Sequence, residues 1–265
     1  MKLSLVIFIL LLSACTQFKE RKPASTNKNI LIIGDSHMAG PFGQYLHQSV
    51  ATNTGVNVLT YGHSSSAPLH WLSDTRHKLS GGVFHQLSAN RTINPNEILK
   101  FRNPNPTDWR ERVEVPSFRS ITENVNLHQQ WEANGFTDTR YDIVVIELGA
   151  NDRRAIVTNE TVNQNAFDQR LLLAKELAEL ATQNGAQCLW VGPPHGRTKT
   201  DFEQETLYKM LEEAINQTSC KLISSNHYKA MGCDGVHFNC REEMDNAKKW
   251  AAEISKTIKD NFSLN

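Results

Sequence analysis

Two short segments of this chain contain the residue types needed for acyl transfer by a serine. Residues 34–37 read Gly-Asp-Ser-His and follow an apolar run, so Ser36 is expected where a buried strand ends. About 200 residues later, Asp234 precedes His237 by three positions, close enough on one loop for the carboxylate to orient the imidazole. A nucleophile, a general base and an orienting acid are the minimum set for a covalent serine intermediate.

Two further segments supply candidate donors for the oxyanion that acyl transfer creates. Asn151 follows the strand-like run 143–146, and Gly62 closes the run 56–60. The oxyanion needs preorganised donors about 3 Å away. The Asn151 amide and the backbone N–H groups of Gly62 and Ser36 meet that need.

In type and order these four blocks resemble the motifs of the SGNH hydrolases, the superfamily of GDSL-type esterases and lipases. The resemblance implies Ser36 as nucleophile, His237 as base and Asp234 as its orienting acid. It also implies an oxyanion hole formed by Ser36, Gly62 and Asn151. The first block reads GDSH rather than GDSL, a variant that resembles bacterial envelope members acting on O-acetylated glycans.

Short apolar runs alternate with amphipathic helical segments, a pattern typical of a parallel sheet covered on both faces. The resemblance implies an α/β fold, a three-layer α/β/α sandwich with a flavodoxin-like parallel sheet of about five strands in the order 2-1-3-4-5. Ligands in such sheets bind where the order reverses, and Ser36 and Asn151 are both expected there. The predicted strands are 29–33, 56–61, 142–148, 186–192 and 220–224.

Amphipathic helices are predicted over 165–184, 201–217 and about 241–260. Their apolar stripes are expected to pack in the core and carry no chemistry. The stripe of the first helix consists of Leu171, Leu172, Ala174, Leu177, Ala178 and Ala181. A further helix is expected around 124–134, before the third strand.

The segment between Gly62 and Tyr141 is much longer than a compact crossover needs. Its part at about 76–125 is interpreted as a long insertion in the domain. The stretch 85–118 is polar, contains four prolines and shows little helical period. Two interpretations fit this composition: a substrate-recognition element or lid, and an irregular surface excursion that does not contact substrate.

The beginning of the chain is interpreted as a targeting segment and excluded from the fold. Lys2 precedes an apolar run over 3–12 that is too short to span a bilayer comfortably. The run leads into Leu-Ser-Ala-Cys, which resembles a bacterial lipoprotein box with Cys15 as the lipidated residue. An ordinary secretory signal with an incidental cysteine is the alternative.

The domain organisation follows from this assignment. We predict a lipoprotein signal peptide over 1–14, a flexible tether over 15–28 and an SGNH hydrolase domain over 29–262. The predicted location is the bacterial cell envelope, lipid-anchored on the periplasmic side of the outer membrane or at the cell surface.

Four cysteines remain after Cys15, and export makes disulfides permissible. A bond between Cys233 and Cys240 would hold the Asp–His segment in register. Cys188 and Cys220 each open a strand-like run and can pair if those strands are neighbours. Four free, buried thiols are the alternative. No Cys or His spacing matches a zinc site well, so no metal and no cofactor is predicted.

Charge and length limit the classes of partner. Lysine plus arginine and aspartate plus glutamate both number 28, so no basic excess favours nucleic acid. About 250 residues remain after the targeting segment, enough for one α/β domain with a full core. The predicted membrane contact is the lipid anchor alone, and the oligomeric state is left open.

Several side chains near the predicted site are candidates for substrate contact. They are His37 after the nucleophile, His63 after the oxyanion glycine, and His195 and Arg197 past the fourth strand. Arg197 suits an anionic substrate group, although a solvated surface arginine is the simpler interpretation. Asp35 and Asp152 are expected to be structural and to hydrogen-bond backbone in their turns.

Together these features predict a serine esterase of the cell envelope. Its expected substrate is an ester-linked acyl group, first of all an O-acetyl group on peptidoglycan or another polysaccharide. An O-acetyltransferase with the same triad is the nearest alternative, followed by a lipase or thioesterase. A non-catalytic, glycan-binding lipoprotein is a further alternative, although a pure binder has no need for a Ser-His-Asp set.

Overall fold

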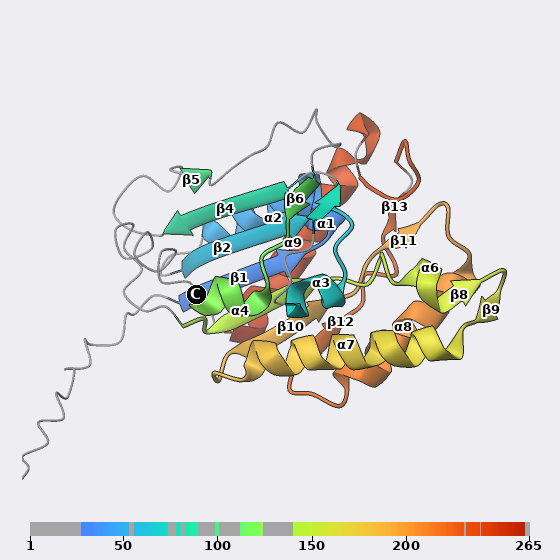
Figure 1. Cartoon of the computed structure of the whole chain (residues 1–265). Helices are drawn as coiled ribbons and strands as arrows, with labels where there is room; N and C mark the ends of the chain where they lie inside the picture. The colour runs from blue at the N-terminus through green and yellow to red at the C-terminus, as the bar shows by residue number, and fades with distance from the viewer. Residues whose placement is uncertain are drawn as a thin grey trace, which may run out of the picture.

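A computed structural model describes most of the predicted domain (Figure 1). The described residues are 28–52, 56–73, 78–80, 83–89, 99–100, 112–123, 140–230, 232–238 and 240–262. The predicted signal peptide, Cys15 and nearly all of the tether lie outside these ranges. The helix expected around 124–134 also lies outside them.

Parallel strands form the body of the central sheet. In the described ranges they are β1 (Lys28–Gly34), β2 (Val56–His63), β7 (Ile143–Glu147), β10 (Gln187–Val191) and β12 (Lys221–Ile223). They lie in the order β2-β1-β7-β10-β12, which confirms the predicted flavodoxin-like order. The order reverses between β1 and β7, where Gly34 is in register with Glu147.

The sheet is wider than predicted. Two antiparallel strands, β4 (Val83–Ala89) and β5 (Leu99–Lys100), extend it beyond β2, so the described sheet has seven strands. The predicted strands included none within the insertion at 76–125, and this is a correction. Apolar and polar residues alternate only weakly along β4. The strand forms because it pairs with β2, not because its own sequence pattern favours a strand.

Helices cover both faces of the sheet and produce three layers (Figure 1). The long helices of the described chain are α2 (Pro41–Ala51), α7 (Gln164–Thr182), α8 (Asp201–Ile215) and α9 (Met244–Phe262). Ile30 and Ile32 of β1 share a core with α2 and α9, whereas Leu31 and Ile33 share the opposite core with α7 and α8. The predicted α/β class is confirmed, and burial on both faces explains the apolar runs.

The three predicted helices are present as α7, α8 and α9, the last after a 3-10 turn at Arg241–Glu243. Most of their predicted apolar stripes are buried. Leu172 is the exception, because its side chain is 62% exposed. It follows the buried Leu171 and therefore points about 100° away around the helix.

Short elements complete the described chain. They are α1 (Ser36–Ala39), α3 (Pro68–Leu72), α4 (Phe118–Glu123), α6 (Arg153–Ile156), and the paired strands β3 (Lys78–Ser80) with β6 (Arg112–Glu114), β8 (Val157–Thr158) with β9 (Thr161–Val162), and β11 (His195–Gly196) with β13 (Lys229–Ala230). Several of these support the segments that carry the predicted site residues.

Both predicted disulfides are present. The bond between Cys188 and Cys220 joins β10 to the chain entering its neighbour β12. The bond between Cys233 and Cys240 closes a small ring that contains Asp234. The alternative of free thiols is therefore wrong.

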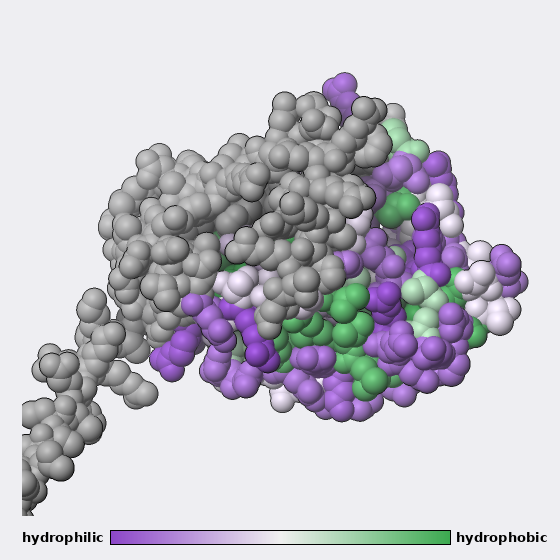
Figure 2. Space-filling view, in the orientation of Figure 1, coloured by the Kyte–Doolittle hydropathy of each residue, from purple (hydrophilic) through white to green (hydrophobic). Residues whose placement is uncertain are grey.

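The surface of the described domain is mostly hydrophilic on the face that Figure 2 shows, with hydrophobic residues gathered where α3 lies against α7. Leu69 of α3 and Leu172 of α7 are both exposed. Within the described ranges, none of the helices has the length and apolar character needed to cross a bilayer.

Candidate active site

The structure brings Ser36, His237 and Asp234 into one hydrogen-bonded chain beyond the carboxyl end of β1. Nε2 of His237 lies 2.7 Å from Oγ of Ser36, and Nδ1 of the same ring lies 2.6 Å from Oδ2 of Asp234. The side chains of His237 and Asp234 are 30% and 40% exposed, so the chain opens to solvent. In this arrangement the imidazole can accept the serine proton while the carboxylate holds its other nitrogen.

Ser36 is held by a tight strand-to-helix turn. It is the first residue of α1, and the Oδ1 atom of Asp35 accepts a hydrogen bond of 3.0 Å from the backbone N–H of His37. A Cβ at Gly34 would lie 2.8 Å from the carbonyl oxygen of Glu147, so only glycine fits there. The turn therefore fixes the direction of the serine hydroxyl relative to the sheet.

The loop with Asp234 and His237 is organised by its own hydrogen bonds. Oδ1 of Asp234 accepts from the backbone N–H groups of Val236 and His237, each at 2.9 Å. Gly235 has a φ of +70°, a left-handed conformation that favours glycine. Burial alone would raise the pKa of Asp234, but the hydrogen bonds from the His237 ring and from the two backbone groups lower it to about 2.

A two-stranded ladder carries this loop back from the edge of the sheet. β12 is an edge strand, and the chain after it pairs through β13 with β11. Further backbone hydrogen bonds join Arg197 to Ala230 at 3.1 Å and Thr198 to Gly235 at 3.3 Å. The segment 195–198 therefore acts as a support for the Asp–His loop, which spacing in the sequence did not indicate.

Asn151 lies beside the nucleophile turn, as expected at the point where the strand order reverses. Its side chain is exposed, and its Nδ2 atom donates to the Ser66 carbonyl at 2.8 Å and to Oδ2 of Asp35 at 3.3 Å. These contacts place an amide with two N–H groups at the edge of the turn that carries Ser36. Both N–H groups are engaged in this arrangement, so the amide can donate to an oxyanion by sharing its longer hydrogen bond, the one to Asp35.

Gly62 lies one residue before the end of β2, and its role as an oxyanion donor stays a prediction. It lies within β2, opposite Gly34 of β1 and Phe84 of β4, so neighbouring strands flank it on both sides. The N–H of such a residue lies in the plane of the sheet and points toward a neighbouring strand. Glycine is needed here for packing, because a Cβ would lie 2.3 Å from the backbone carbonyl carbon of Met38.

The turn after β2 also approaches the site. The Ser66 carbonyl accepts from Asn151, its Oγ donates to the Gly34 carbonyl at 3.2 Å, and its N–H donates to the His63 carbonyl at 3.1 Å. Ser65 has a φ of 66°, a strained conformation for serine. The run of three serines after the apolar strand is the signal that could have indicated this turn.

Two predicted substrate contacts are buried in the structure. The His37 side chain is 3% exposed and packs edge-on against Trp250, with ring centroids 5.6 Å apart. Its ring also lies 5.3 Å from the ring of His237. Burial lowers the pKa of His37 well below its usual range, so the ring is neutral. His63 is 1% exposed. The prediction that either ring touches substrate is therefore corrected.

The other two candidates lie beside the Asp–His loop. The ring nitrogens of His195 contact the Gly196 carbonyl and the Asp201 carboxylate, each at 3.1 Å. Arg197 is exposed, and its side chain packs next to Gly235. Arg197 is thus available to a substrate group at this edge, whereas His195 is already engaged by two partners.

A buried polar layer beneath Ser36 was not predicted. Glu147 at the end of β7 is fully buried, and Arg153 of α6 is 1% exposed with its Nη2 donating to the Pro194 carbonyl at 3.2 Å. A carboxylate directly after four apolar residues was the available signal. Asp152 also differs from expectation: its carboxylate makes no cap for α6 and instead lies 3.4 Å from the guanidinium of Arg170.

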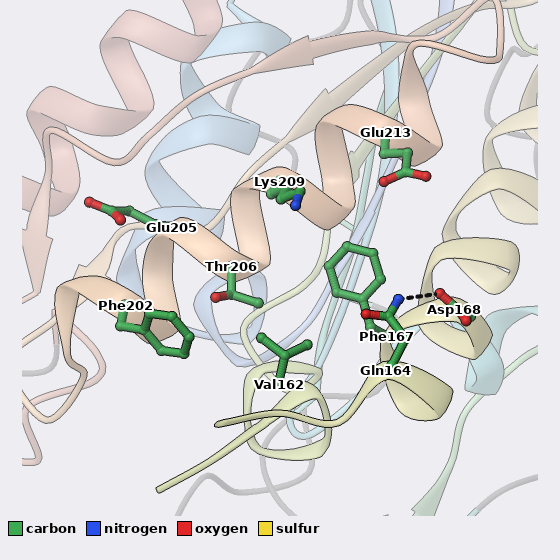
Figure 3. A pocket seen from close by; sticks show the side chains of 9 residues that line it. All are labelled: Val162, Gln164, Phe167, Asp168, Phe202, Glu205, Thr206, Lys209 and Glu213. Carbon is green, nitrogen blue, oxygen red and sulfur yellow. Dashed lines mark hydrogen bonds between the residues drawn. The ribbon is translucent and has the colours of Figure 1, made fainter. Parts of the chain in front are cut away.

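A cavity of about 370 Å³ lies between α7 and α8 (Figure 3). Phe167 and Phe202 line it together with the charged side chains of Glu205 and Lys209. None of the predicted triad or oxyanion residues lines this cavity, so it is separate from the site described above.

Comparison with known proteins finds similarity to one family and to several solved structures. A family described as "Protein of unknown function (DUF459)" matches residues 122–249. No curated protein matches the chain.

Several solved structures resemble it at low identity. They include a carbohydrate acetylesterase family member from Sinorhizobium meliloti, with 13% identity, a TM-score of 0.48 and coverage of 87% of this chain and 98% of that chain. A psychrotrophic esterase from Pseudoalteromonas sp. has 11% identity, a TM-score of 0.47 and coverage of 89% and 100%. A mutant acetylxylan esterase from Geobacillus stearothermophilus has 12% identity, a TM-score of 0.45 and coverage of 86% and 93%.

Proposed function

We propose that this chain is a serine hydrolase that cleaves ester-linked acyl groups through an acyl-enzyme. The observation that carries the proposal is the continuous hydrogen-bonded chain from Ser36 through His237 to Asp234, at 2.7 and 2.6 Å. A serine, an imidazole and an ionised carboxylate in that order form an activated nucleophile. Because these three side chains are open to solvent, a substrate carbonyl can reach Ser36.

In the proposed reaction, His237 takes the proton from Ser36 as its Oγ bonds to the ester carbonyl carbon. Asp234 stabilises the imidazolium that forms. The backbone N–H of Ser36, at the start of α1 where helical N–H groups have no intrahelical partner, faces the oxyanion together with the Asn151 amide. The ester C–O bond then breaks, and His237 returns the proton to the leaving alcohol. Water, activated by the same imidazole, releases the acid from Ser36.

The substrate that we propose is an O-acetyl group on peptidoglycan or another envelope polysaccharide. The GDSH variant of the first block and the predicted export of the chain support this choice. The same proposal places the enzyme at the envelope through a lipidated Cys15, which mass spectrometry of the mature N-terminal peptide tests.

Acetate release measures the substrate proposal directly. The mature protein is incubated with O-acetylated peptidoglycan and with acetylated xylan, and nitrophenyl esters from acetyl to palmitoyl report the chain-length preference. Release of acetate with a preference for short chains is expected. A palmitoyl preference would indicate a lipase, and acetyl transfer to an added glycan acceptor in place of hydrolysis would indicate a transferase. Glycan binding without labelling by a fluorophosphonate probe would indicate a non-catalytic protein.

Gly235→Ala is expected to lower kcat by about 10- to 100-fold, because small displacements of catalytic groups have effects of this size. The new Cβ would lie 2.7 Å from Cγ2 of Thr198, in a backbone with a φ of +70°, so the Asp–His loop must shift. The measurement is steady-state hydrolysis of nitrophenyl acetate. Gly185→Ala is the control, since Gly185 has a φ of +80° with no atom within 4 Å. It should lower the melting temperature without changing kcat; equal effects on kcat would contradict the prediction.

The two disulfides are expected to differ in what their removal changes. The Cys188–Cys220 bond spans 32 residues and the Cys233–Cys240 bond spans 7. The entropic stabilisation by a cross-link grows with the length of the loop that it closes. Cys188→Ser with Cys220→Ser should therefore lower the melting temperature more. Cys233→Ser with Cys240→Ser should lower kcat more, by about tenfold or greater, because the ring that orders the catalytic loop is opened. Thermal melts and nitrophenyl acetate kinetics on both double variants measure these losses. If one double variant showed the larger loss of both melting temperature and kcat, the prediction would be contradicted.

A further inference from the structure

Two buried carboxyl groups lie directly beneath the nucleophile. Asp35 and Glu147 end or follow adjacent strands, and the backbone N–H of Asp35 donates to the Glu147 carbonyl at 3.2 Å. Both side chains are 0% exposed. Together with a ring nitrogen of His37, their oxygens lie within 4.8 Å of one another. Two negative charges at this separation, away from water, cannot both be maintained without a neutralising partner.

Asp35 acts as the acceptor for the catalytic elements. Its Oδ1 accepts from the N–H of His37 in the nucleophile turn, and its Oδ2 accepts from the Asn151 amide. Hydrogen bonds to an ionised carboxylate are stronger than hydrogen bonds to a neutral one. The negative charge of the pair is therefore most useful on Asp35.

Glu147 has no comparable set of donors. Within the described chain, neither of its buried oxygens has a hydrogen-bond partner. The polar side chains set beside them are the carboxyl of Asp35 and the ring of His37. Two carboxyl groups in contact form a hydrogen bond only when one of them carries a proton. Burial, and then the charge of Asp35, raise the pKa of Glu147 well above its usual range. Burial also raises the pKa of Asp35, but only to about 6, because the His37 N–H and nearby positive groups oppose it.

The surrounding charges agree with a single negative charge on the pair. Arg153 of α6 faces both carboxyl groups but forms no ion pair with either among the described residues, and its Nη2 is bonded to the Pro194 carbonyl. His37 is neutral, and His237 approaches Asp35 from the Asp–His loop. Asp152 is the other acidic neighbour and lies beside the guanidinium of Arg170. One proton on the pair leaves one negative charge opposite Arg153.

We propose that Asp35 and Glu147 form a proton-sharing pair, in which protonated Glu147 donates to ionised Asp35 and Asp35 thereby positions the Asn151 amide and the Ser36 turn. Both are positioning residues, since neither touches the reacting atoms. The catalytic part of this inference rests on the proposed ester hydrolysis, whereas the shared proton does not. Because the exposed Asn151 side chain is held by two hydrogen bonds, loss of the Asp35 charge loosens it and lowers kcat more than it raises KM.

The test compares Glu147→Gln, Glu147→Ala and Asp35→Asn. Glutamine keeps the donor that protonated Glu147 supplies, so kcat should stay within about threefold of wild type. Glu147→Ala and Asp35→Asn should lower kcat by about 10- to 100-fold with KM within about twofold, as expected for a misplaced oxyanion donor. A fall in Glu147→Gln as large as in Glu147→Ala would overturn the proposal.

Infrared difference spectra measure the proton itself, without reference to activity. The wild-type minus Glu147→Gln spectrum near neutral pH should contain a protonated-carboxyl C=O band that Asp152→Asn, which removes another buried carboxyl, leaves in place. Lack of that band overturns the proton-sharing pair even if the enzyme is active. Its presence in a protein without esterase activity supports the pair and refutes the proposed function instead. A divalent metal retained at one per chain and lost in Glu147→Gln would also overturn it, because a cation would then neutralise the pair.

Discussion

Ser36→Ala is expected to abolish ester hydrolysis, lowering kcat by about 10⁵- to 10⁶-fold, as loss of a serine nucleophile does in a triad enzyme. The variant should fold normally, since the Ser36 side chain is only half-buried and its hydroxyl is bonded to His237 rather than to the core. Nitrophenyl acetate hydrolysis and fluorophosphonate labelling measure the loss. A thermal melt that matches wild type shows that the fold is intact.

Ser224→Ala is the matched control, because Ser224 is an exposed serine just after β12, outside the catalytic chain. It should retain wild-type activity and labelling. Oxyanion and binding effects alone leave a residual activity far below about 1% of wild type. If Ser36→Ala kept more than about 1% of wild-type kcat, Ser36 would not be the nucleophile.

The parallel strands could be predicted because they are buried on both faces, which produces apolar runs with clear ends. β1 and β7 are such runs, and both lie between the two cores. β4 has no comparable run, and its place beside β2 depends on a contact between distant segments. Patterns within a short window report burial, but they do not report long-range antiparallel pairing.

The positions of Ser36, Asn151 and His237 could be anticipated because each motif follows a predicted strand or lies within reach of one. The roles of their sequence neighbours could not. His37 adjoins the nucleophile, but α1 turns its ring into the cluster around Trp250. A sequence does not show to which side of a turn a side chain points. A residue next to a catalytic residue in the sequence therefore need not contact the substrate.

The length of β2 differs from the expectation at Gly62. The strand was expected to end there, which would have exposed the glycine N–H at the carboxyl edge. β2 continues to His63, and the next turn, with Ser65 at positive φ, reaches Asn151 through Ser66. Strand ends predicted from sequence differ from the observed ends by a few residues, and a shift of this size changes which backbone groups belong to the turn at the site.

Asp234→Asn is the second large effect that we expect, with kcat about 10⁴-fold lower, the size reported for loss of the orienting acid in triads. The amide fits the same space but presents N–H groups to Nδ1 of His237, which favours the wrong tautomer and cannot stabilise the imidazolium. Asp234, with a pKa of about 2, stays ionised across the working range.

The pH dependence of stability tests the negative charge of Asp234. Asparagine keeps the shape of this side chain but not its charge, so the stability that the ionised carboxylate contributes is absent from Asp234→Asn. The folded-state pKa of Asp234 is depressed, so its contribution to stability is present above its ordinary pKa of 3.8 and is lost as the pH falls toward 2. The melting temperatures of wild type and Asp234→Asn should converge over that interval. Glu253→Gln is the matched control, because Glu253 also contacts a histidine, His227 at 3.3 Å, on the exposed surface. An equal loss of activity in Glu253→Gln, or melting temperatures that do not converge between pH 3.8 and about 2, would contradict an orienting role for ionised Asp234.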